Sequence, residues 1–280
     1  MERYIDLHTH TVYSDGLYTP EILVRALALN GIEVFSKTDH DTLAGYEETV
    51  READKWGIIS VPGIEFSTHN YHILGYGFNV TDGFLEVVDY SRELQRQNCR
   101  KRVEVLADYG VPISLEKVQR NFPNSRLGKM NVFMTMLTDE GCRGYLLKKH
   151  GKIIPEEVKA FYFGKGTVLR SDYGSEDLSS HEAISAIHSA GGIAVLAHPG
   201  RDVKSMDELE VLLEQGIDGL EIQPNFYENY AVYEAYANEN SLLLTYGSDY
   251  HGPYMKRGFL GRGMNFLRQN LEERILCFAN

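Results

Sequence analysis

Cysteine is scarce in this sequence, and its spacing excludes two kinds of cysteine chemistry. The 280 residues include three cysteines, and no two of them form a Cys-x-x-Cys pair. An odd, widely spaced set builds neither a disulfide framework nor a thiolate zinc site, and it is typical of a reducing compartment. We therefore expect a cytoplasmic protein in which any bound metal meets nitrogen and oxygen ligands.

Long apolar runs are also absent. The chain opens on a polar stretch that lacks the apolar segment of a signal peptide, and no segment approaches the roughly 18 apolar residues of a membrane span. We predict no membrane partner. Hydrophobic residues make up 43% and charged residues 24% of the chain, which is ordinary for a globular protein of one main domain.

Positive charge is in the minority, and it is concentrated in one segment. The formal net charge is −12, which argues against a general nucleic-acid coat protein because non-specific binding to a polyanion needs a cationic surface. Residues 92–170, however, hold sixteen Lys and Arg against eight Asp and Glu. This segment is either a solvated helical surface or a positive wall that faces an anionic substrate, and the sequence leaves both interpretations open.

Strand and helix patterns alternate through the first ninety residues and again after residue 180. Seven short apolar runs predict strands: 3–8, 32–37, 58–61, 71–75, 193–197, 219–223 and 242–246. Amphipathic segments with capping residues or glycine stops predict helices between most of them: 19–30, 45–56, 180–190, 206–215 and 230–240. Repeated units of this kind imply an α/β fold with a mostly parallel sheet.

A different pattern separates these two runs. It predicts helices over residues 92–109, 115–121 and 132–140, followed by a glycine-rich stretch over 164–173. The basic excess coincides with this change of pattern. We interpret residues 92–175 as an inserted, mostly helical subdomain, and residues 1–91 and 176–280 as two parts of one α/β domain.

Residues that commonly bind metals lie at the predicted strand ends. His8 and His10 are two residues apart at the end of the first strand, so in extended backbone both point to one face. In a parallel barrel the carboxyl ends of the strands meet on one rim, where the active sites of such folds are built. The candidate ligands are His8, His10, Asp15, His40, Glu65, His72, His198, Asp249 and His251.

Nine ligands are too many for a single ion. Six of the ten histidines stand at strand ends beside three carboxylates. Because burying unpaired charges costs free energy, we do not expect such a cluster without a ligand that compensates the cost. Mixed imidazole and carboxylate ligands suit Zn²⁺, Mn²⁺ or Fe²⁺. We therefore predict two or three divalent metal ions, with Glu65 as the carboxylate that bridges two of them.

The order and spacing of these residues resemble the PHP family, which is named for polymerase and histidinol phosphatase. The resemblance covers nearly the whole chain and implies a distorted barrel of seven strands, (β/α)7, with a trinuclear metal site on its rim. Six motifs carry it: His8-x-His10 followed by Asp15, Thr38-Asp39-His40, Gly63-x-Glu65, His72-Ile-Leu-Gly, Ala197-His198-Pro199-Gly200 and Ser248-Asp249-x-His251.

The family pattern also implies how the ligands divide among the ions. The first ion would be held by His8, His10, Glu65 and Asp249. The second would be held by Glu65, His72 and His198, and the third by Asp15, His40 and His251.

The resemblance is closest to a branch with an inserted helical lid. Its members include phosphatases of nucleotide bisphosphates, a cyclic phosphodiesterase and a ribonuclease that trims RNA from its 5′ end. A Gly-Arg-Pro-His motif commonly opens a lid helix in that branch, and here the corresponding stretch is Gly128-Lys129-Met130-Asn131, which keeps the charge but lacks the histidine. The resemblance implies that Lys129, Lys165 and Arg201 face substrate phosphate, although each could be a solvated surface charge.

We therefore predict a metal-dependent phosphoesterase for a small phosphorylated metabolite, such as a nucleotide or a sugar phosphate. Besides Glu65, the predicted catalytic residues are Asp39, Asp249 and His251, any of which could give the leaving oxygen its proton. Two alternatives stay open, a 5′ exonuclease on short oligonucleotides and a non-catalytic, metal-stabilised module. The sequence leaves the oligomeric state open.

Overall fold

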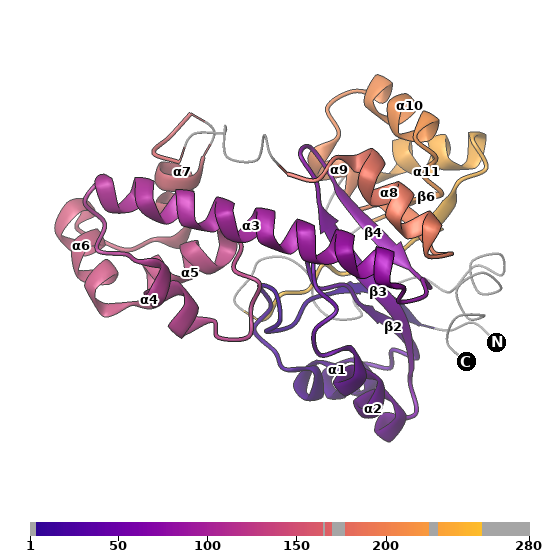
Figure 1. Ribbon diagram of the computed structural model, residues 1–280, viewed down its shortest axis with the longest axis horizontal. Helices are drawn as coiled ribbons and strands as arrows, with labels where there is room; N and C mark the ends of the chain where they lie inside the picture. Colours follow the sequence, from indigo (N-terminus) through magenta and orange to yellow (C-terminus); the bar gives the residue numbers. More distant parts are fainter. Residues whose placement is uncertain (1–3, 165, 170–176, 224–228, 254–280) are drawn as a thin grey trace. The chain divides into compact units, whose positions relative to one another are not determined.

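The structure is a computed structural model that describes residues 4–164, 166–169, 177–223 and 229–253. The chain divides into two compact units (Figure 1). The barrel unit comprises Met1–Ser91 and Leu178–Asn280, and the helical unit comprises Arg92–Asp177.

The barrel unit is built on one sheet of seven strands whose order in space follows their order in the chain. Leu7 N–H donates to Tyr246 O at 3.0 Å, and Thr9 pairs with Tyr250, so the first strand is joined to the residues that follow the last one. The predicted distorted barrel of seven strands is confirmed. The strands are β1 (Ile5–Thr9), β2 (Val34–Lys37), β3 (Ile59–Ser67), β4 (His72–Tyr76), β5 (Ile193–Leu196), β6 (Gly219–Glu221) and β7 (Leu243–Thr245).

The strand β4 is the exception to parallel pairing. It runs antiparallel to both β3 and β5, whereas the other neighbouring pairs are parallel. Only residues 68–71 connect β3 to β4, and a parallel crossover needs a dozen or more residues. The strand β3 is longer than predicted, since it continues through Pro62 and Gly63 to Ser67. A side chain at Gly63 would overlap Ser36 Oγ, so here glycine permits close strand packing instead of ending the strand.

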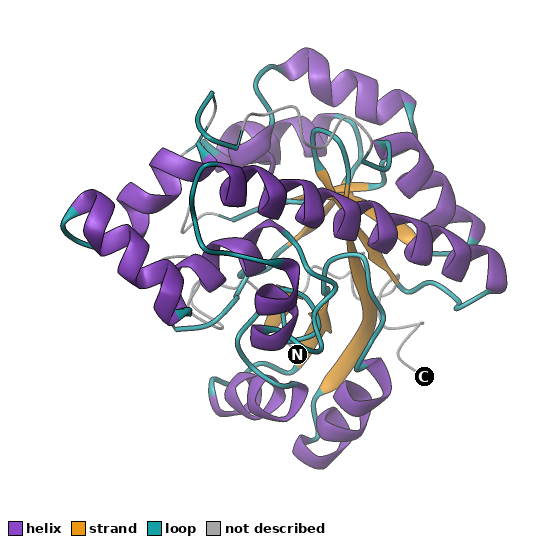
Figure 2. Ribbon diagram, turned by 60° about the vertical axis from the view of Figure 1, so that its left-hand side comes forward, coloured by secondary structure: helices purple, strands orange, loops and turns teal. Residues whose placement is uncertain are grey.

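Helices pack outside the sheet of the barrel unit (Figure 2). Among them, α2 packs against β3, and α8 packs against β4 and β5. Local capping explains where they begin. Thr19 accepts a hydrogen bond from Ile22 N ahead of α1, and Ser179 forms a reciprocal capping box with Glu182 at α8. The helices of this unit are α1 (Pro20–Leu29), α2 (Tyr46–Trp56), α8 (Ser180–Ser189), α9 (Pro199–Asp202), α10 (Met206–Glu214) and α11 (Tyr230–Glu239).

The long helix α3 (Asp82–Asp108) crosses the division between the units and begins ten residues earlier than predicted. Thr81 Oγ1 accepts a hydrogen bond from Phe84 N, which starts the helix. Phe84 and Val88 are buried in the apolar core of the barrel unit. The first turns of α3 are therefore stabilised by packing against this core. The prediction missed them because it relied on the charged residues of the later turns.

In its described residues, the helical unit contains the rest of α3 and four shorter helices, together with an apolar core of its own that includes Val132, Met136 and Tyr162. Two of these helices, α6 and α7, were not predicted. Asp139 accepts a hydrogen bond from Cys142 N to begin α6, and Pro155 occupies the first turn of α7. The short helices are α4 (Leu115–Asn121), α5 (Lys129–Thr138), α6 (Glu140–His150) and α7 (Pro155–Phe163).

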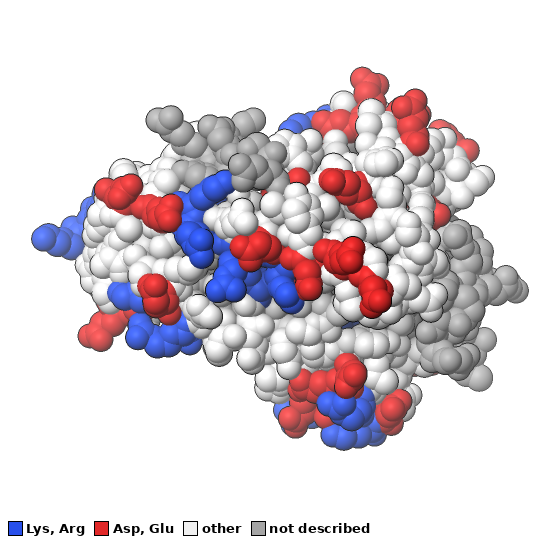
Figure 3. Space-filling view, viewed as in Figure 1, with Lys and Arg blue, Asp and Glu red and all other residues white. Residues whose placement is uncertain are grey.

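Surface charge differs along the chain as the sequence predicts. On the face shown in Figure 3, Lys and Arg side chains gather over the helical unit, with acidic side chains among them. None of the helices in the described part of the chain combines the length and the apolar composition that a bilayer crossing requires.

Candidate metal centre

The strand ends of the barrel unit bring all nine predicted ligands to one rim. His8 and His10 lie at the end of β1, and Glu65 lies near the end of β3. The antiparallel strand β4 contributes its first residue, His72, because its beginning lies at the same rim. The remaining predicted ligands follow strands or lie in connecting loops: Asp15, His40, His198, Asp249 and His251.

Glu65 lies at the centre of this group. Its side chain is fully buried, and the histidines around it come from four different segments of the chain. A single carboxylate surrounded in this way is suited to bridge ions. Five imidazole nitrogens lie 2.8–3.3 Å from its two oxygens: His8 Nε2, His10 Nε2, His40 Nδ1, His72 Nδ1 and His198 Nε2.

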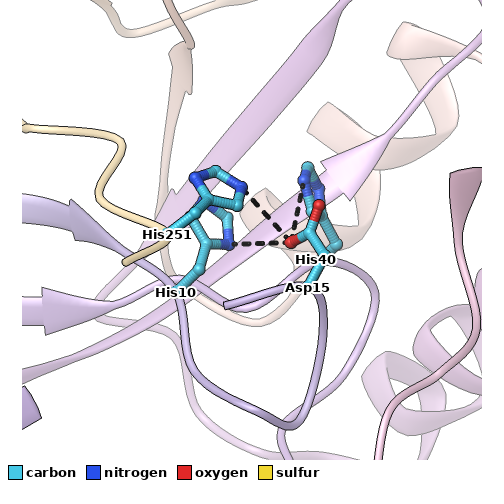
Figure 4. A group of neighbouring side chains, drawn as sticks. All are labelled: His10, Asp15, His40 and His251. Atoms are coloured by element: carbon cyan, nitrogen blue, oxygen red, sulfur yellow. Dashed lines mark ion pairs between the residues drawn. The ribbon is translucent and has the colours of Figure 1, made fainter. Parts of the chain in front are cut away.

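A second group surrounds Asp15 (Figure 4). Asp15 Oδ1 lies 3.3 Å from His251 Nε2, 3.8 Å from His10 Nδ1 and 3.9 Å from His40 Nε2. The rings of His10 and His251 stack with centroids 4.1 Å apart. One carboxylate and three imidazoles therefore face one another in this group.

The ligand atoms form three groups, and within each group all of them lie within 4.8 Å of one another. They are His10, Asp15, His40 and His251; His8, His10, Glu65 and Asp249; and His40, Glu65 and His72. The second set has the four residues of the first ion in the family pattern. The other two sets differ from that pattern, since His10 joins the Asp15 group and His40 stands beside Glu65 and His72, where the pattern has His198.

Several buried atoms of the cluster have contacts but no hydrogen bond of good geometry with the described residues. They are His8 Nε2, His10 Nε2, Asp15 Oδ1 and Glu65 Oε2. Leaving buried polar atoms without hydrogen bonds costs about 1–3 kcal/mol each, and a metal ion removes that cost by accepting their lone pairs. Imidazole nitrogen and carboxylate oxygen together suit divalent transition metals. The residues present therefore fit divalent metal ions.

The cluster also perturbs its own ionisation. Burial alone disfavours protonated His10, but the carboxylates of Asp249 and Glu65 beside the ring outweigh burial and raise its pKa to about 9. Burial alone raises the pKa of Glu65 and of Asp249, yet the surrounding imidazoles hold both well below their usual values. Metal ions compete with these protons for the same atoms.

Backbone geometry at the strand ends is also unusual. Asp41, His198 and Asp249 have φ angles of 49°, 31° and 51°, in the left-handed region that side chains other than glycine rarely adopt. Strained backbone conformations of this kind are common at functional sites, where contacts with the surrounding structure maintain them. At Gly247 the limit is space, since a Cβ atom there would overlap His8.

Asp39, a predicted catalytic residue, lies in a closed set of hydrogen bonds. Its oxygens accept from Thr11 N at 2.7 Å, from the hydroxyls of Thr11 and Ser14, and from Lys37 Nζ at 2.9 Å. Burial raises the pKa of Asp39, but Lys37 and the other neighbours bring it below its usual value. The contacts tie Asp39 to the loop that carries Asp15.

The predicted phosphate-binding residues have different positions. Arg201 lies beside the cluster, with Nη2 3.3 Å from His72 Nδ1 and Nη1 3.7 Å from Asp249 Oδ2. Asp202 holds its guanidinium through Nε at 2.8 Å and Nη2 at 2.9 Å. Lys129 is the first residue of α5 in the helical unit, and Lys165 lies outside the described residues.

Among the described residues, two carboxylates that we did not predict contact imidazole rings of the cluster. Asp202 Oδ2 lies 3.0 Å from His198 Nδ1. Glu221, the last residue of β6, contacts both His8 and the backbone of His198. Glu221 lies in the middle of the predicted strand 219–223, and a carboxylate inside an otherwise apolar strand is the signal that could have identified it. Asp202 follows from no strand end and needed the structure.

Comparisons with known proteins agree on one group of enzymes. Residues 6–125 match the family model described as PHP domain. A 5′-3′ exoribonuclease from Haemophilus influenzae is 30% identical over 265 residues, covering 90% of this chain and 92% of the relative. A phosphoribosyl 1,2-cyclic phosphate 1,2-diphosphodiesterase from Eggerthella lenta is 29% identical over 259 residues, covering 89% and 94%. A solved structure from Bifidobacterium adolescentis, proposed to be a metal-dependent phosphoesterase, has a TM-score of 0.80 at 25% identity and covers 99% of this chain and 96% of that chain.

Proposed function

Because this chain belongs to the PHP domain family, we propose that it is a metal-dependent phosphoesterase that acts on a small phosphorylated metabolite, such as a nucleotide or a sugar phosphate. The observation that carries the proposal is the surrounding of Glu65, one buried carboxylate within 2.8–3.3 Å of five imidazole nitrogens. The names of the two relatives support the reaction class, since an exoribonuclease and a cyclic phosphodiesterase both hydrolyse phosphate esters.

The cofactor would be two or three divalent ions, Mn²⁺, Fe²⁺ or Zn²⁺. The Asp15 group and the group of His8, His10, Glu65 and Asp249 would each hold one. Glu65 and His72, together with His40 or His198, would hold a third. When bound, such ions lower the pKa of coordinated water toward about 7 and neutralise phosphoryl oxygens.

Arg201 is our candidate for anchoring the phosphate. Asp202 holds the guanidinium by two short contacts, so little conformational entropy is left to lose when phosphate binds. Its Nη1 points toward Asp249 at the edge of the cluster, and a planar guanidinium can donate two parallel hydrogen bonds to phosphate oxygens. We propose Lys129 and Lys165 as further phosphate contacts.

For the leaving-group proton, geometry favours Asp249 or His251 over Asp39. All the contacts of Asp39 described above are with donors that stabilise it in place. His251 Nδ1 donates to the backbone oxygen of Asp249 at 2.7 Å, and its Nε2 faces Asp15. Asp249 and His251 therefore share one short turn at the edge of the cluster, whereas Asp39 shapes the loop after β1.

The test is a substrate panel with the purified full chain in Mn²⁺. Nucleotide and sugar phosphates, cyclic phosphates and short 5′-phosphorylated oligonucleotides are incubated with the protein, and products are separated by chromatography. Glu65→Gln protein, purified in parallel, controls for contaminating phosphatases. Hydrolysis of small esters is the expected result. Cleavage of oligonucleotides alone would support the exonuclease alternative, and no hydrolysis of any substrate would overturn both in favour of a non-catalytic module.

The exonuclease alternative has one specific support. The relative from Haemophilus influenzae is named a 5′-3′ exoribonuclease, and the match covers most of both chains. The basic excess of residues 92–170 is compatible with a polyanionic substrate. The cyclic phosphodiesterase from Eggerthella lenta is nearly as similar, so likeness alone does not choose between a small and a polymeric substrate.

A further inference from the structure

Glu221 makes two buried contacts with residues of the candidate metal centre. Its Oε1 lies 2.9 Å from His8 Nδ1, and its Oε2 accepts a hydrogen bond from the backbone N–H of His198 at 2.8 Å. Glu221 is 1% exposed. It ends β6, whereas His8 belongs to β1 and His198 follows β5. One carboxylate outside the predicted ligand set thus joins two predicted ligands from different parts of the barrel unit.

We propose that Glu221 is a positioning residue that keeps a proton on Nδ1 of His8 and thereby reserves Nε2 of the same ring for a metal ion. An ionised carboxylate can only accept hydrogen bonds, so the contact at Nδ1 requires an N–H there. An imidazole with its remaining proton on Nδ1 has its lone pair on Nε2. The inference rests on the proposal that the rim holds metal ions.

The direction of the His8 ring agrees with this role. Its Nε2 faces the centre of the cluster, 3.2 Å from Glu65 Oε2 and 3.4 Å from Asp249 Oδ1. That nitrogen is buried and has no hydrogen bond within the described part of the chain. The two nitrogens of one ring therefore have separate environments, an acceptor behind the ring and the predicted ligands in front of it.

The chain also leaves room for this pair of side chains at one specific residue. A Cβ atom at Gly247 would overlap Cβ of His8 and come within 2.5 Å of Glu221 Oε1. Any side chain at this residue would therefore displace the imidazole or the carboxylate. Gly247 begins the turn that leads to Asp249, so the same turn supplies a ligand and the space for the contact behind His8.

A glutamine at residue 221 separates this role from simple packing. Both contacts of Glu221 require an acceptor, and a glutamine side chain has one oxygen and one NH₂ group. If the oxygen accepts from the fixed N–H of His198, the NH₂ group faces His8 Nδ1 and favours a lone pair there. The proton then moves to Nε2, the atom that should bind the metal. If the glutamine turns the other way, the N–H of His198 loses its acceptor.

The experiment compares the wild type with Glu221→Gln and with Asp6→Asn as a matched control. Asp6 is also fully buried near the rim, but its Oδ1 accepts from the backbone N–H groups of Ser248 at 2.8 Å and His8 at 3.4 Å. An asparagine keeps that acceptor. Zn²⁺ affinity is measured by competition with a chromophoric chelator, and the protonated ring nitrogen of His8 is identified by ¹⁵N NMR of the Zn²⁺-loaded full chain.

We expect Glu221→Gln to weaken Zn²⁺ binding by about 10–100-fold, the usual cost of losing such an outer partner, while Asp6→Asn keeps wild-type affinity. In the wild type, His8 should carry its proton on Nδ1. Equal Zn²⁺ affinities in the wild type and Glu221→Gln would overturn this inference alone, as would a wild-type His8 protonated on Nε2, a measurement that holds even if the variant does not fold. A wild-type chain that binds no metal would overturn the proposed function as well.

Discussion

The barrel unit and the helical unit use their charged residues in opposite ways. In the barrel unit, carboxylates and imidazoles are buried together at the strand ends, and Glu65 and His10 have atoms without good hydrogen bonds. In the helical unit, ion pairs lie near helix ends and the surface, as with Lys117 and Asp139 at 2.9 Å or Lys152 and Glu157 at 2.9 Å. The first arrangement costs stability until a ligand binds, whereas the second leaves its charges in contact with water and contributes only about 0–1 kcal/mol for each pair.

The largest effect should come from the centre of the barrel cluster. Glu65→Ala removes the carboxylate that five imidazoles face, so we expect loss of bound metal and of nearly all turnover, measured by elemental analysis and by kcat. His8→Ala should lose metal and activity in the same way. A fully active Glu65→Ala protein would end the comparison, because the buried charges would then need another explanation.

A core substitution in the helical unit should act on stability alone. Met136 is fully buried in the apolar core of that unit, and Met136→Ala should destabilise it by about 2–5 kcal/mol through lost burial and a cavity. Urea unfolding followed by circular dichroism measures the loss. Zn²⁺ stoichiometry should stay at the wild-type value, and a variant that loses metal in proportion to stability would blur the distinction between the units.

Metal addition should stabilise the barrel unit selectively. At a free Mn²⁺ concentration of about 100 times Kd, binding contributes about 2.7 kcal/mol to the unit that holds the ion. Hydrogen exchange should slow at the strand ends near His10, Glu65 and Asp249, with little change in α5 and α6. Glu65→Gln protein is the control, and in that variant Mn²⁺ should leave exchange unchanged. Equal protection in both units would argue against a local site.

Lys129 tests whether the helical unit takes part in substrate binding. If it contacts phosphate as proposed, Lys129→Ala should raise KM about 10–100-fold with little change in kcat, because one charge-assisted hydrogen bond contributes about 1.5–3 kcal/mol. Lys148, an exposed lysine of the same unit, is the control. An unchanged KM would remove Lys129 from the substrate site and favour the interpretation as solvated surface.

The smallest effect is expected at a helix cap. Asp139→Ala removes the N-cap of α6 and should cost about 1 kcal/mol at neutral pH, without affecting metal binding. The hydrogen bond from Lys117 lowers the pKa of Asp139 below its usual 3.8. A lowered pKa means that the stabilising contribution is present above 3.8 and is lost as the pH falls through the folded-state value. The difference between wild type and variant in urea unfolding should therefore shrink in acid, and a constant difference would exclude the ionic contribution.

Regular patterns were easier to predict than their ends. Short apolar runs were enough to find all seven strands, because the residues of a buried strand form a recognisable local pattern. The end of β3 was missed because proline and glycine have a low strand propensity, and Pro62 and Gly63 lie in the middle of this strand. The close packing of Gly63 against Ser36 explains why a glycine is found there. The early start of α3 and the helices α6 and α7 were missed for a similar reason, because tertiary burial outweighs weak local signals.

The sequence by itself determined the order of the strands, the residue types at their ends and hence the chemistry available at the rim, because these depend on local pattern and on the rule that parallel strand ends meet. Only the tertiary structure decided that Glu65 lies at the centre, that Asp202 holds Arg201, and that Glu221 stands behind His8. These contacts join residues far apart in the chain or depend on side-chain direction. His8 and Glu221, for example, are 213 residues apart in the chain. Their separation in the sequence does not predict their contact, which forms only in the folded barrel.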